Sequence, residues 1–148
     1  MKRESTIAGH WRIGLSLITS LMIIACGNQH SPSGNGPTMA ANELAAISQL
    51  RAIAAAETTY QATAGGGSYG TLEQLIDSQN INPQIKTGEN RGYRFAVRVS
   101  SGTSYEAVAT PLQYGLTGLK SFYMNSSGSE IHGVDKKGVE ATASDPAL

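Results

Sequence analysis

The stretch that decides the fold is "NELAAISQLRAIAAAETTYQATAGGG", residues 42–67. Asn42 is a good N-cap, Glu43 is favourable in a first turn, and alanine has the highest helix propensity. Apolar residues recur at spacings of three and four, as one face of a helix requires: Leu44, Ile47, Leu50, Ile53 or Ala54, and Tyr60. Because glycine ends helices readily, the three glycines at 65–67 mark the end. The pattern predicts a long amphipathic helix that begins at Asn42.

One charged residue, Glu57, falls close to this apolar stripe. A carboxylate is almost never fully buried unless it is paired. We therefore expect the Glu57 carboxylate to reach solvent at the edge of the stripe. The alternative is a buried carboxylate that pairs with an arginine.

Further along the chain the apolar period changes to two, which indicates strands. "GYRFAVRVS" (92–100) and "YEAVATP" (105–111) flank the turn "SSGTS" and predict one hairpin. "KSFYMN" (120–125) and "SEIHG" (129–133) predict a second hairpin. Upstream of both, Thr71 and Gln74 form a capping-box pattern that predicts a short helix over 72–77.

This order of elements predicts an α+β fold, with one long N-terminal helix packed on a small antiparallel sheet of about four strands. We expect the helix to cover the apolar side of the first long strand, formed by Tyr93, Phe95, Val97 and Val99. Residues 42–148 are enough for one small domain with one core.

The residues before the helix have the pattern of an export signal. "MKRESTIAGHWR" (1–12) is basic, and the uncharged run 13–25 is too short to span a bilayer but matches the apolar region of a secretory signal. Cys26, the only cysteine, follows at once. "GNQHSPSGNGPTMA" (27–40) is a linker by composition. We expect a signal peptide at 1–25, Cys26 with a flexible linker over 26–41, and the domain at 42–148.

"IIAC", residues 23–26, resembles the lipobox of bacterial lipoproteins. The resemblance implies that the thiol of Cys26 is acylated, that the chain is cut before it, and that the new amine is usually acylated too. Two or three acyl chains hold firmly, because each buried methylene adds about 0.8 kcal/mol. The alternatives are a free thiol, an unpaired disulfide partner or a core residue. An exported free thiol is a liability and no second cysteine exists, so we predict an exported protein, lipid-anchored in the cell membrane or the outer membrane.

Residues 42–148 resemble the soluble part of type IV pilins and of type II secretion pseudopilins, at "NELAAISQLRAIAAAETTYQ", "GYRFAV", "YEAVATP" and "SFYMNSSGSEIH". The resemblance implies an exported, non-enzymatic subunit. In that family the apolar segment continues unbroken into the helix that packs the filament core. Here the apolar run stops at Cys26, and Pro32 and Pro37 would break such a helix. We expect a pilin-like head carried on a lipid anchor instead of a filament stem.

The charge balance does not suggest a nucleic-acid partner. Removal of the signal leaves eight basic and ten acidic residues, a formal charge of −2. Binding to nucleic acid needs lysines and arginines clustered on one face. Arg91, Arg94 and Arg98 are close in sequence, but Glu89 and Glu106 are nearby, so we interpret them as a solvated strand face.

The domain offers few residues for chemistry. It has one histidine, His132, and no cysteine, whereas a zinc site needs three or four ligands. We interpret His132 as a surface or half-buried strand residue. "GGGSYG" (65–70) lacks the Lys-Ser/Thr ending of a phosphate loop and reads as a helix terminator. We expect no catalytic residue, metal or cofactor.

Two functional hypotheses remain. The first is a non-catalytic, membrane-anchored component of the cell envelope or of a pilus or secretion assembly, with protein partners there. The second is a lipid-anchored binding module for a peptide, glycan or small molecule, held by the open sheet face or the loops around 111–119. Its candidate contacts are Tyr69, Tyr114 and Tyr123.

Overall fold

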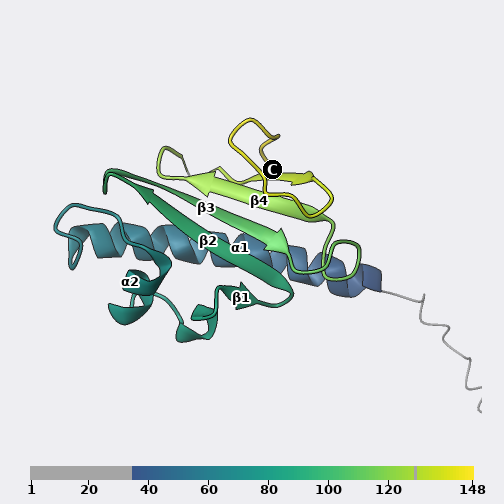
Figure 1. The fold of residues 1–148 in the computed structure, drawn as a ribbon, viewed down its shortest axis with the longest axis horizontal. Helices are drawn as coiled ribbons and strands as arrows, with labels where there is room; N and C mark the ends of the chain where they lie inside the picture. Colours follow the sequence, from purple (N-terminus) through teal and green to yellow (C-terminus); the bar gives the residue numbers. More distant parts are fainter. Residues whose placement is uncertain (1–34, 129) are drawn as a thin grey trace, which may run out of the picture. The chain divides into compact units, whose positions relative to one another are not determined.

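A single long helix packs against one antiparallel sheet in the computed structural model, which describes residues 35–128 and 130–148 (Figure 1). The helix is α1, Asn35–Ala62, and it crosses one face of the sheet. The elements after it are α2 (Leu72–Asp77), the 3₁₀ turn η1 (Pro83–Ile85), β1 (Glu89–Asn90), β2 (Tyr93–Ser100), β3 (Ser104–Pro111), β4 (Lys120–Asn125) and β5 (His132–Asp135). The predicted α+β class is confirmed.

The sheet has five strands in the order β1-β2-β3-β4-β5, and every neighbouring pair is antiparallel. The expected number of about four is therefore one too low. The additional strand, β1, has two residues, which is too short to produce an alternating pattern in the sequence. The first predicted hairpin is present as β2–β3. The second is present as β4–β5, but β5 covers His132–Asp135 and not the predicted residues 129–133.

The main core lies between α1 and the sheet. Tyr93 and Phe95 are buried on the face of β2 that meets the helix, and Val97 and Val99 are partly buried beside them. The expected orientation of β2 is thus confirmed. The buried residues that α1 contributes are Ala46, Leu50, Ile53 and Ala56.

The N-terminal half of α1 differs from the prediction in two respects. The helix begins at Asn35, so residues 35–41, expected to be linker, form its first two turns. Pro37 falls in the first turn, where a missing N–H costs no intrahelical hydrogen bond. Leu44, expected on the buried stripe, is 66% exposed, because the buried positions follow the line of Ala46, Leu50 and Ile53.

Two local sequence signals are confirmed. The Thr71 side chain accepts from the Gln74 amide, and the Gln74 side chain accepts from the Thr71 amide, which is the capping box that begins α2. The glycines after α1 provide the turn that ends it: Gly66 and Gly67 have φ of 57° and 94°, a region that other residues rarely adopt.

The opposite face of the sheet carries a smaller cluster. Val108 and Tyr123 are buried there against Ala141 of the C-terminal segment. That segment returns to the edge of the sheet, where His132 and Ala147 form an isolated bridge. The tail, which shows no period in the sequence, therefore covers part of the second face.

Candidate functional site

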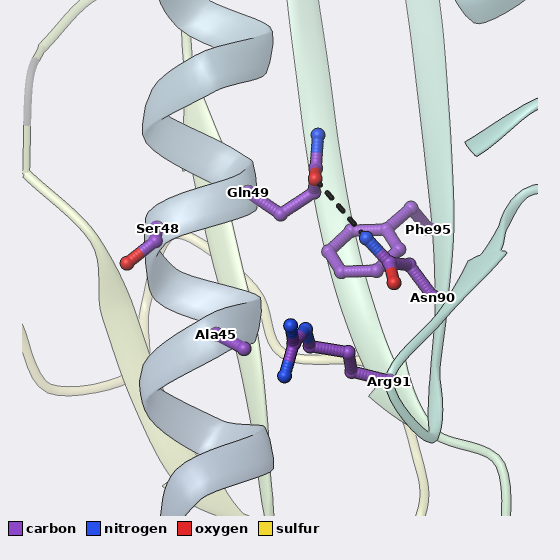
Figure 2. A pocket seen from close by; sticks show the side chains of 6 residues that line it. All are labelled: Ala45, Ser48, Gln49, Asn90, Arg91 and Phe95. Carbon is purple, nitrogen blue, oxygen red and sulfur yellow. Dashed lines mark hydrogen bonds between the residues drawn. The ribbon is translucent and has the colours of Figure 1, made fainter. Parts of the chain in front are cut away.

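A polar cleft lies between the first half of α1 and the turn that joins β1 to β2 (Figure 2). The turn consists of Arg91 and Gly92, whose φ angles are 44° and 77°. Two-residue hairpin turns with positive φ at both positions match the twist of the flanking strands. The close-up shows the Arg91 side chain directed toward α1 beside Ala45. The turn thus places a cation at the helix surface.

Amide groups supply much of the remaining polar lining. Asn90 Nδ2 donates to Gln49 Oε1 at 3.4 Å, which links β1 to α1. The buried ring of Phe95 contributes an apolar wall. Within residues 35–128 and 130–148, no carboxylate pairs with the Arg91 guanidinium. Such a cleft can donate hydrogen bonds to a carboxylate, phosphate or amide group.

Glu57 is fully buried, so the expectation that its carboxylate reaches solvent is wrong. The spacing of Leu50, Ile53 and Glu57 puts all three on the same face of α1. Oε2 of Glu57 accepts from the Gly70 amide at 2.9 Å, whereas Oε1 has no partner in the described part of the chain. The hypothesis of an arginine partner is also wrong, because the donor is a backbone amide.

Gly70 has no side chain, and the Tyr60 ring fills the space beside its Cα. A Cβ at this position would meet the Tyr60 ring at 2.8 Å. Burial raises the pKa of Glu57 above its ordinary value of 4.5, and the hydrogen bond from Gly70 offsets this only in part. Burial, and secondly the charge of Glu57, raise the pKa of Tyr105 to about 12. The hydrogen bond from Gly70 to Glu57 attaches the segment "GGGSYG" to α1. This agrees with the prediction that the segment ends the helix.

The loop between β3 and β4, residues 112–119, is fastened to α1. Asn42 Nδ2 donates to the Thr117 carbonyl at 3.0 Å. Glu43 Oε1 accepts from the amides of Leu119 and Lys120 at 2.9 and 3.2 Å. Asn42 and Glu43 were expected to stabilise the first turn of the helix, but they lie inside it and bind a loop distant in sequence. The local pattern contains no signal for this role.

The three candidate tyrosines lie in three different places. Tyr69 packs edge to face on Tyr105, with ring centroids 4.9 Å apart, and lines a shallow pocket beside α1. Tyr114 is exposed in the 112–119 loop, and its hydroxyl donates to Asp135 at 3.1 Å. Tyr123 is buried on the other face of the sheet. They do not form one binding site.

The remaining sequence candidates have structural partners. His132 is half-buried on β5, as expected, and its Nδ1 donates to the Asp145 carbonyl at 2.6 Å. Arg94 and Arg98 lie on the exposed side of β2, where they pair with Glu89 and Glu140 at 3.1 and 2.7 Å. Arg91 belongs to the turn instead, so the three arginines do not share one face.

The described residues contain neither a metal-binding cluster nor a helix suited to span a membrane. Over 35–128 and 130–148, no three His, Cys, Asp or Glu side chains lie close enough together to hold a metal ion. In the same part of the chain no helix combines the length and apolar character that crossing a membrane takes. Cys26 and the signal peptide predicted at 1–25 lie outside the described residues.

Comparisons with protein families, with curated proteins and with solved structures found no match to this chain.

Proposed function

We propose that the protein is an exported lipoprotein, held in the cell membrane or the outer membrane by acyl chains on Cys26. The observation that carries this proposal is the position of the sole cysteine at the end of a thirteen-residue uncharged run, in "IIAC". Eight residues, 27–34, then lie between Cys26 and Asn35, the first residue of α1. In sequence, Cys26 therefore stands close to the helix that organises the domain.

The domain acts by contact, as a non-catalytic pilin-like component of the cell envelope or of a pilus or secretion assembly. The pilin-like part of the proposal rests on the order of elements, a long helix followed by an antiparallel sheet that it covers. The apolar run ends at Cys26 instead of continuing into α1. The lipid anchor thus takes the place of the filament stem, and the partners are proteins near the membrane.

Mass and location test the anchor. Intact-mass analysis of protein isolated from membranes should show acyl groups on a chain that begins at Cys26, and Cys26→Ser should leave an uncut or mislocalised precursor. A mature chain that begins elsewhere with an unmodified thiol would refute the anchor. Crosslinking and capture from the native membranes, compared with Cys26→Ser, tests the partners: envelope proteins should be lost with the anchor.

The cleft of Figure 2 favours a second candidate function, a binding module. Arg91 of this cleft is an exposed residue, and no ion pair within the described residues engages its guanidinium. A guanidinium can bind a carboxylate or phosphate through two parallel hydrogen bonds. Calorimetric titration with acidic peptides and sugar phosphates tests this candidate. Binding that Arg91→Ala abolishes and Arg94→Ala retains would support it.

A further inference from the structure

Exposed large apolar side chains gather at one end of the domain. Seven such residues occur in the described part of the chain, and five of them lie on the 112–119 loop or on the turn of α1 fastened to it. We call these five the apolar rim: Leu44, Leu112, Tyr114, Leu116 and Leu119. Their exposed fractions run from 37% to 66%. A gathered set of exposed apolar side chains marks an interaction surface.

The loop that carries the rim is held in shape by its own hydrogen bonds. The Thr117 side chain donates to the Gln113 carbonyl and accepts from the Gln113 amide, both at 3.1 Å. Gly115 donates to Gly118 across the base of the loop, and Glu43 fixes the end of the loop to α1. These hydrogen bonds order the loop, and its three leucines, Leu112, Leu116 and Leu119, are exposed on it.

The rim lies at the end of the domain where the anchor segment joins. In Figure 1 the β3–β4 loop runs beside the N-terminal part of α1. The β2–β3 turn is at the other end, where the Gly102 carbonyl accepts from Tyr69, beyond the C-terminus of α1. The 28 residues of α1 are about 42 Å long. The nine Cα–Cα steps from Cys26 to Asn35 span at most about 32 Å, so a bilayer that holds Cys26 is within reach of the rim.

Charges border the rim on the side of α1 and β4. Residues 112–119 carry no charge, whereas Lys120 follows the loop and Arg91 adjoins Gly92, which packs on Thr117. Two acidic groups lie at the same border and both are engaged. Glu43 accepts from two loop amides, and Asp135 accepts from the Tyr114 hydroxyl and the Lys137 amide. Asp135 stands opposite Lys120 in the β4–β5 pairing, but no ion pair within the described residues engages Lys120 or Arg91.

We propose that the apolar rim rests on the bilayer that holds the acyl chains of Cys26. The leucines and Tyr114 lie at the boundary between headgroups and acyl chains, and Lys120 and Arg91 meet the anionic headgroups. Apolar side chains flanked by cations bind such an interface, and tyrosine is enriched there. The inference rests on the proposed function, since acylation of Cys26 brings the bilayer within reach. It sets the orientation of the domain, with the β2–β3 turn directed away from the membrane.

Single tryptophans test this orientation. The only tryptophan of the chain is Trp11, so Trp11→Phe with Leu116→Trp gives one probe in the rim. Trp11→Phe with Thr103→Trp is the matched control, because Thr103 is an exposed residue of the β2–β3 turn. Each protein is isolated from membranes and reconstituted in vesicles that contain anionic lipid. The fluorescence emission of the rim probe should lie at shorter wavelength than that of the control probe. Lipids with brominated acyl chains should quench the rim probe and leave the control probe unquenched.

Three results would overturn the inference. In the first, the rim probe responds no more than the control, so the rim is in water. In the second, both probes are quenched alike, so the domain has no preferred orientation. In the third, the rim probe shifts with rising protein density but bromine does not quench it, so a second copy covers the rim.

Failure of the anchor can be separated from failure of the inference. If intact mass shows a free thiol at Cys26, lipidation is refuted, and the same proteins are then coupled through Cys26, their only cysteine, to a maleimide headgroup lipid. Selective quenching of the rim probe in these vesicles supports the docking of the rim by itself. Absence of quenching there overturns it.

Discussion

Glu57 of α1 and Gly70, thirteen residues later, are joined by a hydrogen bond of 2.9 Å from the Gly70 amide to the buried Glu57 carboxylate. No cation pairs with this carboxylate in the described part of the chain. Burial without a counter-charge disfavours the ionised form, and the pKa of Glu57 is accordingly raised above 4.5. The free energy of unfolding must therefore depend on whether Glu57 holds its proton.

The first prediction is a loss of stability on raising the pH. The folded state holds the Glu57 proton at a pH where the unfolded chain has released it, so the contribution of this group is largest below pH 4.5 and is lost as the pH rises through the elevated pKa. Asp145 acts in the opposite direction, since its hydrogen bond with Lys136 lowers its pKa below 3.8. The stability that Asp145 contributes is therefore lost only below pH 3.8, outside the range in which Glu57 is tested. Denaturant unfolding at pH values from 4 to 8 measures how the free energy of unfolding changes with pH.

The second prediction separates the proton of Glu57 from its hydrogen bond. Glu57→Gln keeps an acceptor for Gly70 and has nothing to ionise, so its stability should be nearly constant over the same pH window. Glu57→Ala leaves the Gly70 amide without its acceptor, which costs about 1–3 kcal/mol. Parallel slopes for the wild type and Glu57→Gln would assign the pH dependence to another group.

The fold could be predicted where local patterns decide it. The capping box of Thr71 and Gln74 and the alternation of β2 specify elements whose partners are close in sequence. The start of α1 could not be predicted in this way. Asn42 is a good N-cap by composition, yet its side chain bonds to Thr117, and tertiary contact of this kind overrides local propensity.

The candidate site was less predictable because it depends on contacts between distant segments. The spacing of Leu50, Ile53 and Glu57 contains the signal that the carboxylate is buried, but the general rarity of buried carboxylates outweighed it. The cleft depends on a two-residue strand and on Arg91 with positive φ. Neither feature produces a repeating pattern of apolar residues that could be recognised in the sequence.

The third prediction concerns the core face of α1. Ile53 is fully buried, so Ile53→Ala should lower the free energy of unfolding by about 2–5 kcal/mol. Leu44 is the matched control on the same helix: it is 66% exposed, and Leu44→Ala should change stability by no more than about 0.5 kcal/mol. Denaturant unfolding measures both. Equal losses at the two sites would mean that the helix is rotated from the orientation described.

The fourth prediction concerns the attachment of the 112–119 loop. Glu43→Ala removes the acceptor for the amides of Leu119 and Lys120, so both amides should exchange with deuterium faster than in the wild type. Glu43→Gln retains an acceptor oxygen and should restore much of the protection. Exchange at Leu75, in the core of α2, serves as the internal reference. Unchanged protection at both loop amides in Glu43→Ala would show that Glu43 does not hold the loop.

The fifth prediction concerns the close approach of Gly118 to Tyr93. A Cβ at residue 118 would overlap the hydroxyl of the buried Tyr93 and lie 2.7 Å from its Cζ. That hydroxyl donates to the Lys120 carbonyl at 2.8 Å, so the ring cannot move without losing the bond. Gly118→Ala should therefore lower the free energy of unfolding by about 1–3 kcal/mol, whereas Gly128→Ala, with no contact closer than 3.8 Å, should be neutral.

In a double-mutant cycle with Tyr93→Phe, the cost of Gly118→Ala should fall because the overlapping hydroxyl is gone. Strictly additive costs would show that the two residues are not in contact.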